Sequence, residues 1–258
     1  MDVTGQLLDR ARSGDGDAFA ELTGVFRREL QVHCYRILGS AADAEDMLQE
    51  TMMAAWRGLG RFEGRASLRT WLHAIATNKC LNHLRAARPR PAYTPEVPLP
   101  EPSRSGEPRW LEPFPDALLS DLPDAGPGPE ARYETRESVS LAFVAALQHL
   151  PPRQRAALVL RDALGFRAAE TAAILGCTVD AANNLLKRAR ATIAGHLPPG
   201  GRDAAPLPGS AREHQVTTRF ADAFERGDVE AIVALLTEDA WLTMPPLPFE
   251  YHGRDAVG

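Results

Sequence analysis

Two proline-rich stretches constrain this chain more than any other feature, because proline interrupts helices and removes a backbone donor from strands. Residues 89–130 contain PRPAYTPEVPLPEPSRSGEP and DLPDAGPGPE, and residues 198–211 read PPGGRDAAPLPGSA. Segments of this composition are typical of linkers. We therefore expect no regular helix or strand in them, apart from one apolar segment within the first, and separate blocks on either side.

The block before the first linker, residues 10–90, has the pattern of a helical bundle. Apolar residues recur at helical spacing over 18–38, and Gly39 can end that helix. A second helix should follow over 40–58, opened by the weak capping box SAAD. A third should cover 67–88 and end at the prolines. The block is therefore predicted to be all-helical.

The block between the linkers, residues 135–197, contains the most informative motif. Residues 166–190, FRAAETAAILGCTVDAANNLLKRAR, read as two short helices joined by a tight turn. This is the pattern of a helix-turn-helix, whose second helix enters the major groove of DNA. Asparagine can pair there with adenine, arginine and lysine can pair with guanine, and other polar groups contact phosphate. An ordinary helical hairpin with a solvated polar face is the competing interpretation.

Charge is distributed unevenly along the chain, whose formal net charge is −5. Residues 91–137 and 203–258 each carry 10 acidic and 4 basic residues, whereas the remainder carries 14 acidic and 21 basic ones. Residues 61–90 alone hold 7 basic residues and 1 acidic one. Such a basic segment suits a phosphate backbone, and exposed aromatic and asparagine side chains within it suit unstacked bases. Core packing is the alternative for Trp71.

The acidic helix just before this basic segment is a candidate protein interface. Residues 43–57 place acidic and amide side chains on one face, which alone is most often a solvated face. Exposed Met52, Met53 and Trp56 beside it would favour an interface.

Two further segments differ from the helical blocks. WLEPFPDALLSDL, at 110–122, is too apolar for a spacer. We expect a short helix that packs on a neighbouring domain, with a partner-binding element as the alternative. Residues 213–258 read as two amphipathic helices followed by a strand, WLTMPP.

No catalytic or metal-binding pattern emerges from the sequence. Cys34, Cys80 and Cys177 lie far apart, which is typical of a reducing compartment. Cys80 and His83 are three residues apart, but no second ligand pair has metal spacing. The sequence also shows no pattern typical of a nucleotide-binding loop, a signal peptide or a membrane span. We expect a cytoplasmic protein that is not an enzyme and needs no cofactor or metal.

The order of these pieces resembles the extracytoplasmic-function (ECF, group 4) RNA polymerase sigma factors of the sigma-70 family. DAEDMLQETMMAAWRGLGRFEG, followed by SLRTWLHAIATNKCLNHLR, is similar to sigma region 2. LQHLPPRQRAALVLRDALGFRAAETAAILGCTVDAANNLLKRAR is similar to region 4. The resemblance covers about 15–90 and 138–197. It implies a mainly α fold with two helical domains, and an alternative sigma factor that directs promoter recognition, DNA melting and transcription initiation.

The resemblance also implies partners and roles for individual residues. The partners would be promoter DNA, core RNA polymerase through its β′ clamp helices and β flap, and in some members an anti-sigma factor. The clamp helices would contact Asp46, Gln49, Glu50 and Trp56. The −10 element would contact the loop 62–66 and the helix after it, through Phe62, Arg65, Arg69, Trp71, Asn78, Lys79, Asn82 and Arg85. The −35 element would contact Arg167, Asn183, Asn184, Lys187, Arg188 and Arg190.

The chain departs from the family pattern in two places. Family recognition helices often read T-V-K/R-S-R where residues 181–185 read AANNL, which leaves the −35 preference open. Beyond a linker at 198–212, residues 213–258 resemble the start of a SnoaL-like (NTF2-like) domain, thought to modulate sigma activity in cis. The WLEPFPD element in the 91–134 linker is typical of the same subgroup. Either the sequence is a fragment, or this partial α+β extension lacks the usual pocket.

Two other classes of protein remain as alternatives. A conventional helix-turn-helix regulator would bind duplex DNA by itself, usually as a dimer, and would leave the acidic-then-basic order of residues 43–90 unexplained. An enzyme located in the C-terminal region would need a closed cavity beyond residue 214.

Overall fold

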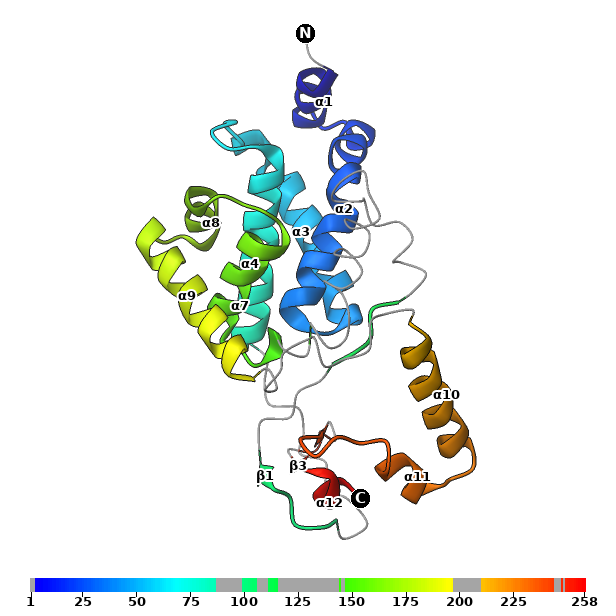
Figure 1. The fold of residues 1–258 in the computed structure, drawn as a ribbon. Helices are drawn as coiled ribbons and strands as arrows, with labels where there is room; N and C mark the ends of the chain where they lie inside the picture. The colour runs from blue at the N-terminus through cyan, green and yellow to red at the C-terminus, as the bar shows by residue number, and fades with distance from the viewer. Residues whose placement is uncertain are drawn as a thin grey trace. The chain divides into compact units, whose positions relative to one another are not determined.

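The computed structural model describes residues 3–86, 99–105, 111–115, 144, 147–196, 210–243, 247 and 249–258. The chain forms two compact units, whose helices and strands are drawn in Figure 1. The first unit comprises Met1–Ala87 and Leu111–His196. The second comprises Arg88–Trp110 and Leu197–Gly258.

A bundle of helices, here called the first helical block, covers residues 3–86. It contains α1 (Val3–Arg12), α2 (Gly16–Leu38), α3 (Ala41–Gly58), the 3-10 turn η1 (Leu59–Arg61) and α4 (Leu68–Ala86). Local chemistry sets the helix ends as predicted. Gly39 closes α2 with a φ of 75°, and Ser40 caps α3 by accepting from the backbone N–H of Asp43.

The core of this block lies where α2, α3 and α4 pack together. Large apolar side chains from all three helices are fully or almost fully buried there, namely Leu30, Tyr35, Ile37, Leu48 and Leu72. Burying side chains of this size supplies the main driving force for the bundle. The outward faces of the helices are mostly polar, with Val25, Met53 and Trp56 as exposed apolar exceptions.

The second helical block covers residues 147–196 and contains the expected helix-turn-helix. Its helices are α7 (Pro152–Leu158), the π-helical turn η3 (Val159–Ala163), α8 (Ala168–Leu175) and α9 (Val179–His196). Gly176 ends α8 in the left-handed conformation, at φ 58°, which glycine adopts without strain. Leu158 of α7 and Val159 of η3 pack against Leu186 and Ala189 of α9 in a shared apolar cluster. The helix-turn-helix prediction is confirmed.

The apolar linker segment packs on the first helical block, but its described part is not helical. Residues 111–115 lie in neither a helix nor a strand, and Phe114 is buried against Tyr35 at 4.8 Å between ring centroids. Tyr35 Oη also donates to the Glu112 carbonyl at 2.7 Å. Packing is therefore confirmed, whereas the predicted helix is wrong for 111–115, where the two prolines oppose it. The rest of 110–122 lies outside the described residues.

The second unit contains two helices and a small antiparallel sheet. Helices α10 (Ala211–Glu225) and α11 (Val229–Val233) precede the strand β2 (Trp241–Thr243), as the pattern predicts. They are followed by β3 (Phe249–His252) and the short helix α12 (Arg254–Val257). The sheet order is β1-β3-β2.

Strand β1 (Arg104–Ser105) comes from the first linker, where we expected no strand. It pairs with β3, and Arg104 donates to the buried carboxylate of Glu250 at 2.7 Å. Tyr251 Oη and the His252 N–H donate to Pro100 and Ser103 respectively, at 3.0 Å each. Partners more than 140 residues away thus override the local proline signal and correct the linker prediction.

Candidate nucleic-acid and protein interfaces

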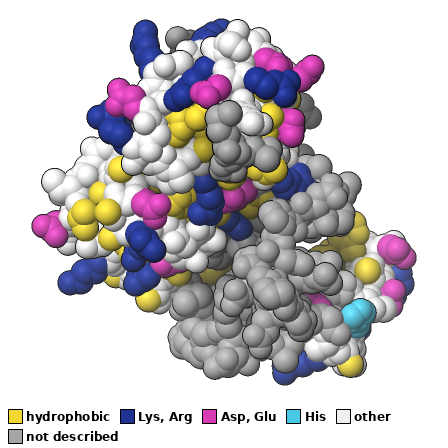
Figure 2. Space-filling view, turned by 90° about the horizontal axis from the view of Figure 1, so that it is seen from above, with side chains coloured by type: hydrophobic (Ala, Val, Ile, Leu, Met, Phe, Trp, Pro, Cys, Tyr) yellow, Lys and Arg dark blue, Asp and Glu magenta, His cyan; other side chains and the backbone are white. Residues whose placement is uncertain are grey.

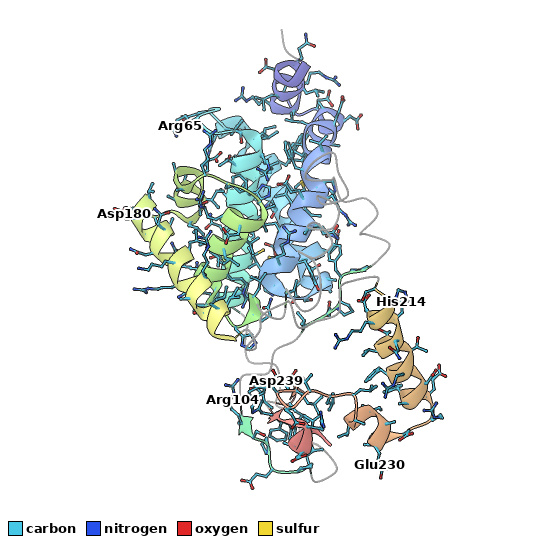
Figure 3. All side chains as sticks on the ribbon, in the orientation of Figure 1. Arg65, Arg104, Asp180, His214, Glu230 and Asp239 are labelled. Atoms are coloured by element: carbon cyan, nitrogen blue, oxygen red, sulfur yellow. The ribbon has the colours of Figure 1, made fainter. Side chains whose placement is uncertain are left out.

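The recognition helix α9 presents a row of exposed polar and basic side chains. Asn183, Asn184, Lys187 and Arg188 are all exposed, while Ala182, Leu186 and Ala189 face the core. Arg190 is also exposed, and its guanidinium makes two hydrogen bonds to Asp162 of η3, at 2.7 and 3.0 Å. Figure 3 shows Asp180, at the start of α9, on the outer side of the helix.

The residues just before α8 complete this surface. The Arg167 side chain is exposed, and its backbone N–H donates to the Glu170 carboxylate at 2.9 Å, which fixes the first turn of α8. All six residues predicted for −35 contacts therefore lie on the accessible side of the helix-turn-helix.

Helix α4 exposes a second polar row. Asn78, Asn82 and Arg85 are exposed along α4, and Arg65 is exposed in the loop before it. Arg65 forms an ion pair with Glu63 at 3.0 Å and points outward in Figure 3. Figure 2 shows acidic and basic side chains mixed over the face that it draws. Within the basic segment, Arg65, Arg69 and Lys79 each form an ion pair with a glutamate, which partly neutralises its charge.

The aromatic residues of this region are less accessible than predicted. Phe62 is buried, and its ring lies 5.0 Å from that of Trp71, which is half-buried. Burial of Phe62 removes a large apolar surface from water, so exposure would be costly. The expectation of an exposed aromatic surface is wrong for Phe62 in this conformation.

Two basic residues predicted to contact the −10 element are held by acids of other helices. Arg69 Nε donates to Glu29 of α2 at 2.7 Å, and Lys79 Nζ donates to Glu50 of α3 at 2.9 Å. Lys79 and Glu50 remain partly exposed, at 36% and 45% of their side-chain surface. The sequence predicts Glu50 to contact the clamp helices and Lys79 to contact the −10 element, and the structure shows that the two side chains also bind each other.

The acidic face of α3 is accessible on its outer side. Asp46 and Gln49 are exposed, and Trp56 is 39% exposed with its ring edge-on to Phe19 at 5.1 Å. Of the two methionines whose exposure would favour an interface, Met52 is buried and Met53 is 51% exposed. A partly exposed tryptophan beside an exposed methionine is a typical feature of protein interfaces.

Buried titratable groups in the first block are not available for chemistry. Burial lowers the pKa of His73 to about 4 and that of His33 well below its usual range, so both rings are neutral at pH 7. Burial also raises the pKa of the Cys80 thiol, with Cys34 beside it adding to the effect. A thiol held in its neutral form is a poor nucleophile.

Within the described residues, no three His, Cys, Asp or Glu side chains gather in a way that could bind a metal ion. The same residues include no helix with the length and apolar character needed to cross a bilayer.

Several residues that organise these surfaces carry no recognisable signal in the sequence. Glu29, His73, Phe166 and Glu112 are held by contacts with residues far away in the chain. Helical periodicity places a residue on a face but does not name the partner that the face meets.

Comparisons with known proteins agree with this architecture. A sequence model of sigma-70 region 2 matches residues 25–90, and one of sigma-70 region 4 matches residues 140–193. The ECF RNA polymerase sigma factor SigG of Mycobacterium tuberculosis is 44% identical over 252 residues, covering 95% of this chain and 65% of SigG. The chain thus spans just under two thirds of that relative's length.

Two further relatives are matched by this chain over most of their own length. RNA polymerase sigma-H factor of Pseudomonas aeruginosa is 32% identical over 200 residues, covering 77% of this chain and 96% of the relative. The crystal structure of the M. tuberculosis ECF sigma factor SigJ matches with a TM-score of 0.56 and 26% identity, covering 90% of this chain and 70% of SigJ. The chain belongs to the extracytoplasmic-function group of the sigma-70 family of RNA polymerase sigma factors.

Proposed function

We propose that the chain acts as an alternative sigma factor, which binds core RNA polymerase and directs it to promoter DNA. The observation that carries the proposal is the exposed row on α9, which includes Asn183, Asn184, Lys187 and Arg188. This row lies on the second helix of a helix-turn-helix, the helix that enters the major groove in proteins of this architecture. Asparagine is a modest helix former, so hydrogen bonding to DNA bases explains its presence in α9 better than helix propensity does.

The outer face of α3 is the proposed docking site for the polymerase clamp helices. Asp46, Gln49 and Trp56 are accessible, and Glu50 lies between them and α4. Exposed α4 residues, Asn78 among them, are then the proposed contacts for the opened −10 element, since unstacked bases present edges that amides can read.

The ion pair between Glu50 and Lys79 supplies a physical link between these two events. In the free protein each charge partly neutralises the other. A polymerase group that binds Glu50 leaves Lys79 available for a phosphate. Exposed ion pairs contribute about 0.2–1 kcal/mol, so the coupling amounts to a factor of about 1.4 to 5.

The remaining proposals concern the setting of the protein. We propose a cytoplasmic location, because the proposed partners, core RNA polymerase and promoter DNA, are in the cytoplasm. The second unit, with its small sheet, is proposed to be the start of a SnoaL-like module that modulates sigma activity in cis. Removing residues 203–258 should then raise DNA binding, and an unchanged affinity at low salt would contradict that role.

Polymerase binding is tested by capture of purified core enzyme on the tagged full chain. Replacing Gln49 and Glu50 with alanine should reduce the affinity about tenfold or more, as expected for two central interface residues. A control of the same residue types replaces Gln6 and Glu21, which are exposed on α1 and α2. Equal losses in both variants would argue against the assigned face.

The Glu50–Lys79 link is tested by single-stranded DNA binding to the free protein. Glu50→Gln should raise the affinity about twofold, because Lys79 loses its partner. The same substitution in a Lys79→Gln background should change nothing. A rise that persists without Lys79 would contradict the link.

A further inference from the structure

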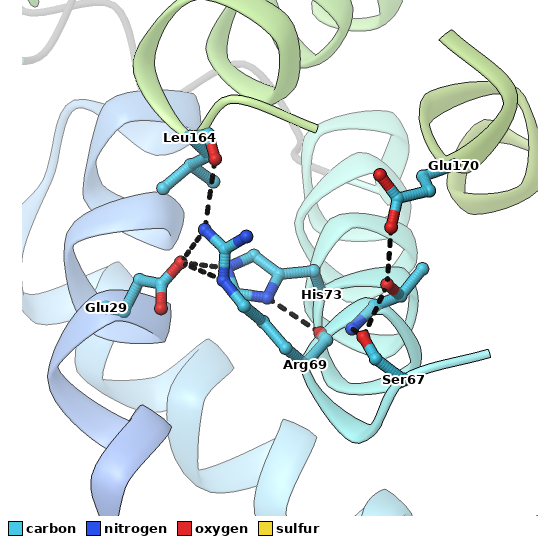
Figure 4. Close-up of polar contacts among 7 residues, drawn as sticks. Glu29, Ser67, Arg69, His73, Leu164 and Glu170 are labelled. Carbon is cyan, nitrogen blue, oxygen red and sulfur yellow. Dashed lines mark hydrogen bonds and ion pairs between the residues drawn. The ribbon is translucent and has the colours of Figure 1, made fainter. Parts of the chain in front are cut away.

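The turn that connects η3 to α8 in the second helical block is inserted against the first. Phe166 is buried and packs edge-on against His73 of α4, with 5.0 Å between ring centroids. The guanidinium of Arg69 lies over the same ring at 4.3 Å, within the range of a cation–π contact. Figure 4 shows Arg69 between Glu29 on one side and Leu164 on the other.

Arg69 is therefore shared by both blocks. It donates to Glu29 of α2 through Nε and Nη2, and Nη2 also donates to the Leu164 carbonyl at 3.1 Å. Only about a third of the Arg69 side chain is exposed (35%), and 21% of Glu29 is exposed. A partly desolvated, charge-assisted contact of this kind is stronger than a surface ion pair.

The second block presents a preformed turn to this site. Gly165 adopts a φ of 69°, and the Arg161 side chain donates to the Phe166 carbonyl at 2.6 Å. At the same interface, Thr70 Oγ1 of α4 donates to the Glu170 carboxylate of α8 at 3.3 Å (Figure 4). Arg69 and Thr70, which are consecutive residues of α4, thus both hold the second helical block against the first.

These contacts conflict with the proposed role of Arg69 in binding the −10 element. The guanidinium lies over Phe166 and donates to Glu29 and Leu164 through Nε and Nη2, so these two nitrogens are not available to a phosphate in this arrangement. We propose that Glu29, Arg69 and the turn Leu164–Phe166 form a latch, which holds the two helical blocks closed and keeps Arg69 from nucleic acid until they separate. The latch deepens the proposed function, on which it rests, by adding regulation to the same surface.

The closed contact itself is tested by cross-linking, without nucleic acid. Thr70→Cys and Glu170→Cys are combined with Cys177→Ser, while Cys34 and Cys80 stay buried in the core. Dibromobimane, a short bifunctional thiol reagent, should join the two new cysteines within one chain, and adding Phe166→Ala should reduce the yield. Separate labelling of both cysteines, with no cross-link before or after that change, would overturn the latch.

The consequence for Arg69 is tested by fluorescence anisotropy with a single-stranded DNA oligonucleotide and the full chain. Asp9→Asn is the control, because it also removes one negative charge, from the exposed Asp9–Arg12 pair of α1. Glu29→Gln should raise the affinity for the oligonucleotide about two- to fivefold more than this control does. Equal effects of the two variants would overturn the latch. A normal cross-link with no DNA binding by any variant would support the packing and overturn the proposed function instead.

Discussion

Removal of the linker glutamate Glu112 should destabilise the first unit measurably. Its Oε2 accepts from the backbone N–H groups of Ala41 and Ala42, at 2.8 and 3.3 Å, and from Ser40 Oγ at 3.1 Å. A carboxylate at this helix end satisfies donors that have no partner within the helix and interacts favourably with the helix dipole. Ser40 keeps its own cap to Asp43, so Glu112→Ala leaves that cap in place and removes the contacts of the Glu112 carboxylate.

The magnitude follows from the charge-assisted hydrogen bonds, reduced because the site is half-exposed, and from the dipole term. Together they amount to about 2 kcal/mol. For a unit of roughly 170 residues, each kcal/mol shifts the melting temperature by about 2–4 °C, so Glu112→Ala should melt about 4–8 °C lower. Glu112→Gln keeps an acceptor and should lose less.

Thermal unfolding of the full chain, followed by circular dichroism, provides the measurement. Melting of Glu112→Ala within 1 °C of the original chain would refute the capping argument. If that variant kept its melting temperature but lost polymerase binding, the linker segment would be a partner-binding element instead.

Two further predictions concern the stability of the same unit. Because burial lowers the pKa of His73 to about 4, against about 6.5 when unfolded, stability should fall by roughly 3 kcal/mol as the pH drops from 6.5 to 4. The Glu29 carboxylate and the hydrogen bond of His73 to the Arg69 carbonyl oppose this lowering of the pKa, whereas the Arg69 charge adds to it. Urea unfolding that is unchanged between pH 7 and pH 4.5 would contradict this. Gly39→Ala should lower the free energy of unfolding in urea by about 1–2 kcal/mol, because the backbone of Gly39 is in the left-handed conformation. The added Cβ would also meet Gln148 at 3.1 Å, whereas Gly60→Ala meets nothing within 4 Å and serves as control.

The sequence predicts well those features that are determined within a few residues. Gly39 and Ser40 set the α2–α3 boundary by their own backbone and side-chain chemistry, and Gly176 does the same between α8 and α9. The exposed row on α9 follows from helical periodicity alone. The helical fold and the helix-turn-helix were therefore predictable without a structure.

Features that depend on distant partners were not predictable in the same way. The Arg69–Leu164 contact joins residues 95 apart, Ser40 and Glu112 are 72 apart, and Arg104 and Glu250 are 146 apart. Local composition pointed away from a strand at Arg104–Ser105, because prolines surround it. Pairing with β3 satisfies backbone groups that the local pattern leaves open.

The same argument explains the errors at the candidate site. An aromatic residue in a basic segment fits an exposed stacking surface and a core position equally well. Phe62 takes the core position because Trp71 lies opposite it, one turn into α4. Which basic residues are neutralised by acids also depends on helix packing, as Lys79 and Glu50 illustrate.

The central claim, a sigma factor with separate polymerase and promoter surfaces, is tested most directly by transcription in vitro. Core RNA polymerase is supplied with the full chain and a genomic fragment library, and transcript starts are mapped. Discrete starts that share an upstream element are predicted. They should be lost with Gln49→Ala/Glu50→Ala, and weakened or shifted with Asn183→Ala/Lys187→Ala. No start above that of core polymerase alone, from a chain that still binds duplex DNA by itself, would contradict the account and indicate a conventional helix-turn-helix regulator.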